Sequence, residues 1–379
     1  MIKRILALAL ILVMVFAVGC EKTPTSSSST TTTTTTAAAT DTTTEEVTTT
    51  ASESTTTAEL VTTEPPTEDP DEGYTTDTMK KIVVTTKELD RLAPAIAVDK
   101  KTIGDTMYSP ISRQDYVLKW MDDFNGTTLN MANWSYRSDN SNGGELQKNR
   151  AENVSVANGN LLIKAEKLAT PIQETKADNT IRKFPYAAGK IDSSGKVFYK
   201  YGRFEASIKM PKGKGVWPAF WTMGNGKGWP WGGEIDIIEL VGGEERSSDG
   251  VYHSAIHWCD PNAGAEAWID EAQGGAHKAG SGGTYTLPDN DKGKALGDEY
   301  QVYGMEWDSR KISFYLNGCM FGRIDVAKDA DPTKSVAFHI PHFVILNFAL
   351  GGWPPAPDAT TVFPQTMKVD WVKIWQVKK

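Results

Sequence analysis

One apolar segment carries three acids and limits the folds open to this chain. The segment is GGEIDIIELVGG, residues 232–243. Its isoleucines predict a β-strand, on which successive side chains point to opposite faces. Glu234 and Asp236 then share one face, whereas Glu239 falls on the other and would be buried unpaired, which is costly. A β-bulge between Asp236 and Glu239 removes the conflict, because one extra residue returns Glu239 to the face of the other two.

Short strands recur along residues 105–379. The alternating runs are NVSVANGNLLIKAEK, GRFEASIKMP, YQVYGMEWDSRKISFYLNGCMFGRID, FHIPHFVILNFALGG and MKVDWVKIWQV. Turn residues separate them, and ISFYLNGCMFGRI predicts one hairpin that turns at Asn317-Gly318. The region is long enough for one large core. The pattern predicts an all-β sandwich of two antiparallel sheets.

Tryptophans gather in front of the three acids, in the segment GVWPAFWTMGNGKGWPWGGE. Trp217 and Trp221 share one face of a predicted strand, and Trp229 and Trp231 lie in a Gly/Pro-rich loop that enters the acid strand. A single tryptophan more often packs in a core. Four of them beside three acids favour a sugar-binding cleft on a concave sheet face, because indoles stack on the apolar faces of sugar rings.

The spacing of the acids predicts a reaction as well as a fold. With the bulge, Glu234 and Glu239 lie two residue pairs apart, and side chains that lean inward bring the carboxyls to about 5–5.5 Å, the separation of retaining glycosidases. Close carboxylates do not all ionise freely, so at least one pKa should rise. Alternatively, the acids only solubilise an edge strand. The apolar spacers Ile235, Ile237 and Ile238 argue against an edge.

The acid segment resembles a known family. GEIDIIE matches the E-x-D-x-x-E signature of glycoside hydrolase family 16, and the likeness covers residues 115–379. Further motifs occur in the family's order: DDFNG, GELQ, YGRFEASIKMP, WPAFWTM, SAIHW, NFALGGWP and FPQTMKVDWVKIW. The chain is most similar to the laminarinase branch. The resemblance implies a concanavalin-like β-jelly roll with a concave cleft, and a retaining endo-β-1,3-glucanase that acts by double displacement without a catalytic cofactor.

The resemblance also implies a role for each acid. Glu234 is expected to be the nucleophile, Glu239 the general acid/base, and Asp236 the residue that orients and tunes the pair. His257, in SAIHW, is expected near the leaving-group side of the cleft; the alternative is a core histidine bonded to backbone. The residues expected to contact substrate are Trp221, Trp229, Trp231, His257 and Asn347. Asn347 is the weakest of these, since a buried asparagine can simply bridge strands.

Some family members bind a structural calcium ion on the convex face. The matching positions here are Asp123, the carbonyl of Gly159 and Asp370. The family usually has DEF where this chain has Asp122-Asp123-Phe124. Calcium takes six to eight oxygens, so other carbonyls and waters would have to complete the shell. A calcium site and a metal-free domain both stay open at this point.

Other functions fit the same residues. Within the family, mixed-linkage glucan, agarose, carrageenan or β-galactan hydrolysis are alternatives. The long segment after His257, CDPNAGAEAWIDEAQGGAHKAGSGG, is expected to be a Gly-rich loop near the cleft that can reshape sugar sites. A non-catalytic glucan-binding surface lectin is a further alternative. Such relatives typically lose the carboxylates that this chain retains.

The N-terminal part has a different composition. MIKRILALALILVMVFAVGC, residues 1–20, has a basic start and an apolar run too short for a comfortable span, which predicts a secretory signal. Its AVGC ending resembles a bacterial lipobox, which implies a lipid anchor on Cys20 and a cell-surface, membrane-attached protein. An ordinary signal peptide is the alternative. Residues 21–73, rich in Ser, Thr and Pro, predict a disordered stalk.

The net charge limits the kinds of partner that the folded region can bind, and the cysteines leave two alternatives open. The formal net charge of −8 resides in the stalk, so residues 73–379 are close to neutral and show no basic excess for nucleic acid. We expect a monomer whose partners are a β-glucan and a membrane. Residues 74–104 are an extension or a linker. Cys259 and Cys319 form either a disulfide or two separate thiols, because sequence distance gives no geometry.

Overall fold

The computed structural model describes residues 106–139, 144–176, 178–243, 251–273, 275–285 and 296–379. The predicted signal and Cys20, the predicted stalk (21–73) and the segment 74–104 lie outside the described residues. Within the described ranges, no helix is long and apolar enough to cross a membrane.

Strands make up nearly all of the regular structure. Sheet A contains β1 (Thr106–Tyr108), β2 (Asp115–Asp122), β4 (Gln147–Asn149), β5 (Val154–Ala157), β6 (Asn160–Thr175), β7 (Ile181–Ala188), β10 (Gly202–Lys209), β15 (Gln301–Trp307), β16 (Lys311–Leu316), β17 (Cys319–Asp325) and β19 (Gln365–Val377). Sheet B contains β3 (Ser135–Tyr136), β8 (Lys190–Asp192), β9 (Phe198–Tyr199), β11 (Val216–Gly224), β12 (Glu234–Val241), β13 (Val251–Trp258), β14 (Lys278–Tyr285) and β18 (His342–Leu350). Short 3₁₀ turns are η1 (Ala151–Asn153), η2 (Ala265–Trp268), η3 (Glu271–Gln273), η5 (Leu296–Asp298) and η6 (Pro332–Lys334).

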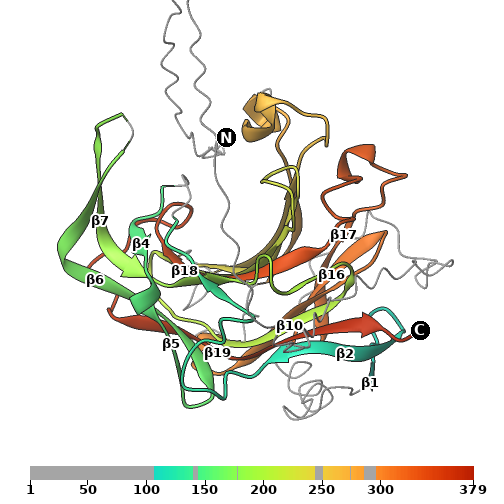
Figure 1. Ribbon diagram of the computed structural model, residues 1–379, viewed down its shortest axis with the longest axis horizontal. Coiled ribbons are helices and arrows are strands. Elements are labelled where there is room, and N and C mark those ends of the chain that lie inside the picture. Colours follow the sequence, from blue (N-terminus) through green and yellow to red (C-terminus); the bar gives the residue numbers. More distant parts are fainter. Residues whose placement is uncertain (1–105, 140–143, 177, 244–250, 274, 286–295) are drawn as a thin grey trace, which may run out of the picture. The chain divides into compact units, whose positions relative to one another are not determined.

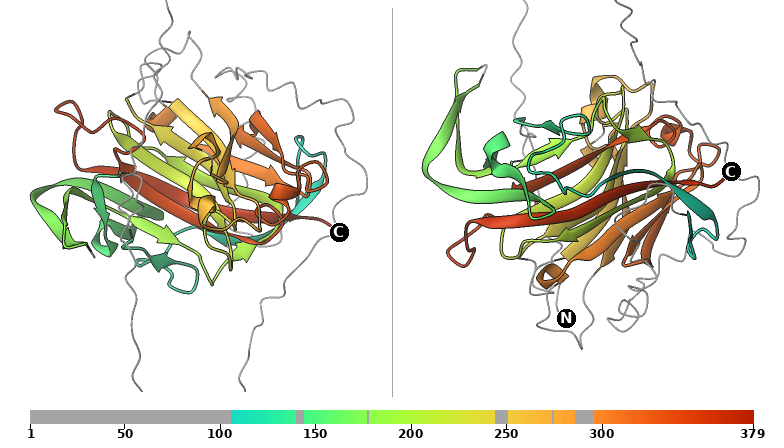
Figure 2. Two further views of the ribbon diagram at one scale, coloured as in Figure 1. Left: turned by 90° about the horizontal axis from the view of Figure 1, so that it is seen from above. Right: turned by 60° about the horizontal axis from the view of Figure 1, so that its bottom comes forward.

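The two sheets pack face to face, as Figures 1 and 2 show. Sheet A runs in the order β17-β16-β15-β10-β19-β6-β7-β4, and sheet B in the order β14-β13-β12-β11-β18-β8-β3. Neighbouring strands are antiparallel except for the parallel pair of β4 and β7. A single large apolar cluster fills the space between the layers, with residues such as Phe204 and Ile374 from sheet A and Phe220 and Leu346 from sheet B. The all-β jelly-roll prediction is confirmed.

Two Asn-Gly turns form as predicted. At Asn317-Gly318 the φ angles are 48° and 76°, and at Asn158-Gly159 they are 54° and 69°. Positive φ at both central residues matches the twist of the strands that a tight hairpin joins. The first turn links β16 to β17 and the second links β5 to β6.

The Gly-rich segment after His257 differs from the prediction in one part. Its C-terminal end is no loop: Lys278–Tyr285 is strand β14, which pairs with β13 at the edge of sheet B. The glycines serve close packing, since a Cβ at Gly280 would lie 2.6 Å from Cδ1 of Ile324, and one at Gly282 would lie 2.2 Å from Cε2 of Phe314. The two sheets approach so closely here that only glycine fits.

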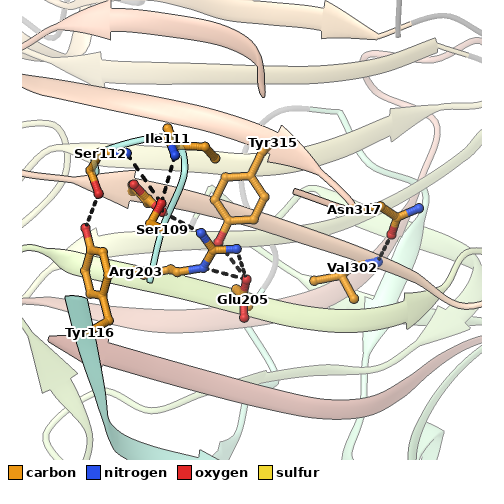
Figure 3. A network of polar contacts seen from close by, with 10 residues as sticks. Ser109, Ile111, Ser112, Tyr116, Arg203, Glu205, Val302, Tyr315 and Asn317 are labelled. Atoms are coloured by element: carbon orange, nitrogen blue, oxygen red, sulfur yellow. Dashed lines mark hydrogen bonds and ion pairs between the residues drawn. The ribbon is translucent and has the colours of Figure 1, made fainter. Parts of the chain in front are cut away.

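The outer face of sheet A carries a buried ionic network (Figure 3). Arg203 donates from Nε to Glu205 at 2.7 Å, and its Nη1 donates to Glu306. The Tyr315 hydroxyl donates to Glu205 at 3.0 Å, and the Arg203 guanidinium lies 4.2 Å from the centre of the Tyr315 ring. Ser109, in the turn between β1 and β2, donates to Glu306. The guanidinium therefore compensates two buried carboxylates.

The cysteine alternatives are also resolved. Cys259 is buried, Cys319 is partly buried, and both are free thiols. Burial raises the pKa of the Cys259 thiol to about 11, so it stays protonated at neutral pH. The disulfide alternative is therefore wrong for this structure.

Candidate active site

The acid strand β12 lies between β11 and β13, so it is not an edge strand. Asp236 pairs with Ala255 and Glu239 pairs with His253, so three steps along β12 oppose two along β13. This is the predicted bulge. Ile235 belongs to the core between the sheets, and the three acids therefore share the outer face of sheet B.

A glycine pair precedes the acid strand for a steric reason. Gly233 has φ of +73°, and a Cβ there would lie 2.6 Å from the carbonyl oxygen of Ala337. Any side chain would push the start of β12 away from this neighbour. Gly233 therefore fixes where Glu234 enters the sheet.

Burial raises the pKa of two of the three acids, Asp236 and Glu239. Burial raises the pKa of Asp236 well above its usual range, and the charges of Glu234 and Glu239 add to the effect, as does a hydrogen bond with Glu234. Burial likewise raises the pKa of Glu239 to about 8, although a hydrogen bond from Trp217 Nε1 to Glu239 Oε1 (2.9 Å) opposes the rise. Among the described residues, no lysine or arginine forms an ion pair with the three acids; the nearest base is His257, whose Nε2 lies 3.5 Å from Asp236 Oδ2.

An aromatic cluster lies beside Glu239. It consists of Trp217, His253 and Trp353. The Trp353 ring lies 5.8 Å from that of Trp217 and 4.7 Å from that of His253. Trp353 is 47% exposed, so its ring is available to stack on a sugar.

Trp221 and Asn347 both lie on the outer face of sheet B, and their contact with substrate stays a prediction. Trp221 Nε1 donates to Asn347 Oδ1 at 2.6 Å, and both side chains are partly exposed. The bond joins β11 to β18, so Asn347 also bridges strands. Lys190 of β8 completes this part of the face, with Nζ 5.5 Å from the centre of the Trp221 ring.

A second aromatic cluster lies at the Glu234 end of the acid strand. Trp229 and Trp231 lie in the loop before β12, as predicted, and their rings lie 5.3 and 5.9 Å from the ring of Trp268. Trp268 comes from η2, in the segment that follows His257, and is 60% exposed. In Figure 1 this segment, drawn in gold, rises on one side of sheet B, and the β6–β7 hairpin rises on the other.

His257 lies on the acid face, opposite Glu234 in the register of β12 and β13. His257 thus shares the face of the acids, and its expected place near the leaving group stays a prediction. Its Nδ1 lies 3.1 Å from Nε2 of His277, and His277 Nδ1 contacts the carboxylate of Asp270. Burial lowers the pKa of His257, and only the Glu234 and Asp270 charges oppose this effect.

The sandwich agrees with comparisons to known proteins. The family described as "Beta-porphyranase A-D, GH16 domain" matches residues 116–377. The chain belongs to glycoside hydrolase family 16. Among solved structures, this family 16 domain is similar to an endo-β-1,3-glucanase from Pyrococcus furiosus, with a TM-score of 0.56 and 31% identity, over 72% of this chain and 98% of that one.

Two curated relatives differ in what their names say. Glucan endo-1,3-beta-glucosidase A1 of Niallia circulans is 30% identical over 283 residues, which cover 68% of this chain and 38% of that protein. Keratan-sulfate endo-1,4-beta-galactosidase of Sphingobacterium multivorum is 28% identical over 70% of this chain and 57% of that protein. The chain thus spans less than two thirds of the length of either relative.

The residues expected to bind calcium lie in one neighbourhood. Asp123 accepts from the backbone and side-chain nitrogens of Asn125, and a Cβ at Gly159 would lie 3.2 Å from Oδ1 of Asn125. Asp370 lies near Tyr300, whose hydroxyl donates to the residue after Gly159. Across the described residues, no three His, Cys, Asp or Glu side chains gather as a metal site. An ion here would therefore depend mainly on neutral oxygens, and calcium stays a prediction.

Sequence reasoning left some of the site's side chains unassigned. Trp353 stands in the NFALGGWP motif, and Trp217 lies on the predicted strand face of Trp221, so both carried a signal. His277 and Trp268 carried none, since they stand in a Gly-rich segment with no periodic pattern. Their places depend on how that segment folds back on itself.

Proposed function

We propose that this domain cleaves a β-linked polysaccharide internally by a retaining double displacement, and that β-1,3-glucan is the substrate. One observation carries the proposal: the bulge of β12 brings three acids to the outer face of sheet B, where no described lysine or arginine pairs with them. Uncompensated carboxyl groups with separated proton affinities are what acid/base chemistry on a glycosidic bond requires.

Each acid has a distinct task in this scheme. Glu239 keeps its proton near neutral pH and donates it to the leaving oxygen, held in place by Trp217. Glu234, the most exposed of the three, attacks the anomeric carbon as that bond breaks. Asp236 makes a hydrogen bond to Glu234 and orients it. Water then attacks the same carbon and returns a proton to Glu239.

The aromatic side chains support endo action. One cluster flanks Glu239 and the other lies at the Glu234 end, so ring-stacking positions extend to both sides of the acids. A polymer that runs across the face can therefore bind on both sides of the broken bond. An exo-acting site would need one side blocked.

β-1,3-Glucan is favoured because the Niallia and Pyrococcus relatives are named as enzymes acting on that linkage. A β-galactan is the second candidate, supported by the matching family description and by the name of the Sphingobacterium relative. Full-length protein incubated with laminarin, barley glucan, lichenan, agarose, porphyran and keratan sulfate separates them. We expect reducing ends and a ladder of oligosaccharides from laminarin. Release from the galactans alone would select the second candidate, and release from none would contradict both.

Two parts of the proposal concern residues away from the acids. The lipobox-like ending supports a membrane anchor on Cys20, and Cys20→Ser should then move the protein from the membrane fraction to the soluble fraction. The neighbourhood of Asp123, Gly159 and Asp370 supports a structural calcium ion. Chelation by EGTA should in that case lower the unfolding temperature, and added calcium should restore it.

A further inference from the structure

The side chains of His277 and Asp270 extend the polar contacts of the acid site from His257 toward solvent. His257 Nδ1 and His277 Nε2 are 3.1 Å apart, and the ring planes differ by 19°. His277 is 8% exposed, and its Nδ1 contacts the Asp270 carboxylate, which is 54% exposed. An unbroken series of polar groups therefore joins Asp236 to the surface through two imidazoles.

Hydrogen bonds within its own backbone fold the segment that carries Asp270 and His277. His277 N donates to the Ile269 carbonyl at 2.9 Å, and Glu271 N donates to the His277 carbonyl at 2.8 Å. A Cβ at Gly275 would lie 1.9 Å from the oxygen of Ile269, so the turn needs glycine. The Trp229 ring lies 4.7 Å from that of His277. The backbone hydrogen bonds and the neighbouring Trp229 ring thus fix the position of His277.

The Asp270 carboxylate determines which ring nitrogens of His277 and His257 donate and which accept. A carboxylate only accepts, so His277 donates from Nδ1 and, when neutral, accepts at Nε2. His257 must then donate from Nδ1, which leaves the lone pair of its Nε2 facing Asp236 Oδ2 at 3.5 Å. Among the residues that the structure describes, none forms a hydrogen bond with Asp236 Oδ2. Such contacts are often long without substrate and shorten in the complex.

We propose that Asp270 and His277 are positioning residues that hold His257 in this tautomer and take up the proton of Asp236 during the reaction. The inference rests on the proposed double displacement. When Glu234 bonds to the sugar, its negative charge disappears. The Asp236 proton then passes to His257 Nε2, and the His257 Nδ1 proton passes to His277 Nε2.

The transfer balances within the protein. One O–H and one N–H bond break, and two N–H bonds form. Asp236 becomes a carboxylate beside the uncharged glycosyl ester of Glu234, and His277 becomes an imidazolium beside Asp270. Both protons return when water releases the sugar. The ionisable groups next to the two imidazoles are Glu234, Asp236 and Asp270, whereas Lys278 pairs with Glu271 at 2.7 Å.

The first test reads the tautomer directly and needs no turnover. With ¹⁵N-labelled histidine, the ring nitrogens of His257 are assigned in the full-length protein and in the variants His277→Phe and Asp270→Asn. We expect the Nδ1-protonated tautomer in the parent and its loss in His277→Phe, which keeps an aromatic ring but accepts no hydrogen bond. Asp270→Asn keeps an acceptor, so the tautomer should persist. An Nε2-protonated His257 in the parent would overturn the proposal.

The second test is kinetic. His277→Phe should lower kcat about tenfold or more with KM within about threefold, because the proton of Asp236 then has no destination. Asp270→Asn should lower kcat severalfold through loss of the charge beside the imidazolium, and its exposed side chain makes misfolding a minor concern. The matched control is Glu271→Gln, an exposed neighbour that should leave kcat unchanged.

The outcomes separate this proposal from the proposed function. An unchanged kcat in both His277→Phe and Asp270→Asn, on a substrate that the parent hydrolyses, overturns the relay alone. A parent protein that hydrolyses nothing refutes the double displacement, and the tautomer measurement still decides whether His277 holds His257 in this tautomer.

Discussion

The outer faces of the two sheets each bury a pair of carboxyl groups, and they treat the charge in opposite ways. On sheet A, Glu205 and Glu306 surround Arg203 (Figure 3). On sheet B, Asp236 and Glu239 are also buried, with an imidazole rather than a guanidinium near Asp236. All four side chains are carboxylic acids, and the difference is the cation.

The cation decides what the carboxyl groups can do. Burial of a lone charge is expensive, and a well-placed guanidinium offsets much of that cost. The sheet A acids therefore serve structure. Burial alone would lower the pKa of Arg203, but the negative charges of Glu205 and Glu306 outweigh it and raise that pKa. The sheet B acids have no such partner among the described residues, and burial there favours their protonated forms. A proton retained at neutral pH is what a general acid needs.

The largest effect should come from removing the uncompensated glutamates. Glu234→Ala and Glu239→Ala should each lower kcat/KM by about a thousandfold or more on polysaccharide. With a dinitrophenyl glycoside, Glu239→Ala should still form the covalent intermediate, because that leaving group needs little protonation. Added azide should then yield a β-glycosyl azide from Glu239→Ala. A β-glycosyl azide from Glu234→Ala instead would reverse the two roles. The matched control is Glu205→Gln on sheet A, which should keep kcat per folded molecule.

Removing the cation should harm stability and not chemistry. Arg203→Met leaves two buried carboxylates unpaired, and the free energy of unfolding should fall by about 3–5 kcal/mol. Arg310→Met removes an arginine from an exposed pair with Asp329 and should leave the unfolding midpoint nearly unchanged. Urea denaturation of both variants measures the contrast. Equal decreases in the free energy of unfolding would show that the Arg203 charge does not stabilise sheet A by pairing with Glu205 and Glu306.

On sheet B, neutralising an acid should stabilise the fold. A raised folded-state pKa gives stability that is complete below the unfolded pKa and is lost as pH rises toward the folded value. Asp236→Asn mimics the protonated form, so its free energy of unfolding at pH 7 should exceed the parent's by about 1 kcal/mol. The gain should vanish near pH 4. A destabilised Asp236→Asn at pH 7 would contradict the direction of the Asp236 shift.

The smallest effect concerns the tuning of Glu239. Trp217 donates to its carboxylate and lowers its pKa, so Trp217→Phe should raise that pKa further above about 8. The alkaline limb of kcat/KM should then move upward by about half a pH unit. Trp353→Phe, which removes an indole that makes no bond to Glu239, serves as the control. A downward movement in Trp217→Phe would contradict the assignment of this limb to Glu239.

The sequence predicted the acid face because its evidence is local. The period of a strand and three acids require the bulge, and Ile235, Ile237 and Ile238 place the strand away from an edge. Strand β14 could not be predicted, since Gly280 and Gly282 look like loop residues until sheet A is known to press against them. The place of His277 in the site could not be predicted for a similar reason. Its contact with His257 depends on the folded-back segment, and no spacing along the chain records that arrangement.

The central claim is that the two uncompensated glutamates of sheet B act in succession on one face of the sugar. Proton NMR of the first products released from laminarin, or from the polysaccharide that the substrate panel selects, tests this most directly. The account predicts that the β-anomer appears first and that the α-anomer grows later by mutarotation. An α-anomer released first would show inversion and would contradict the double displacement by Glu234 and Glu239.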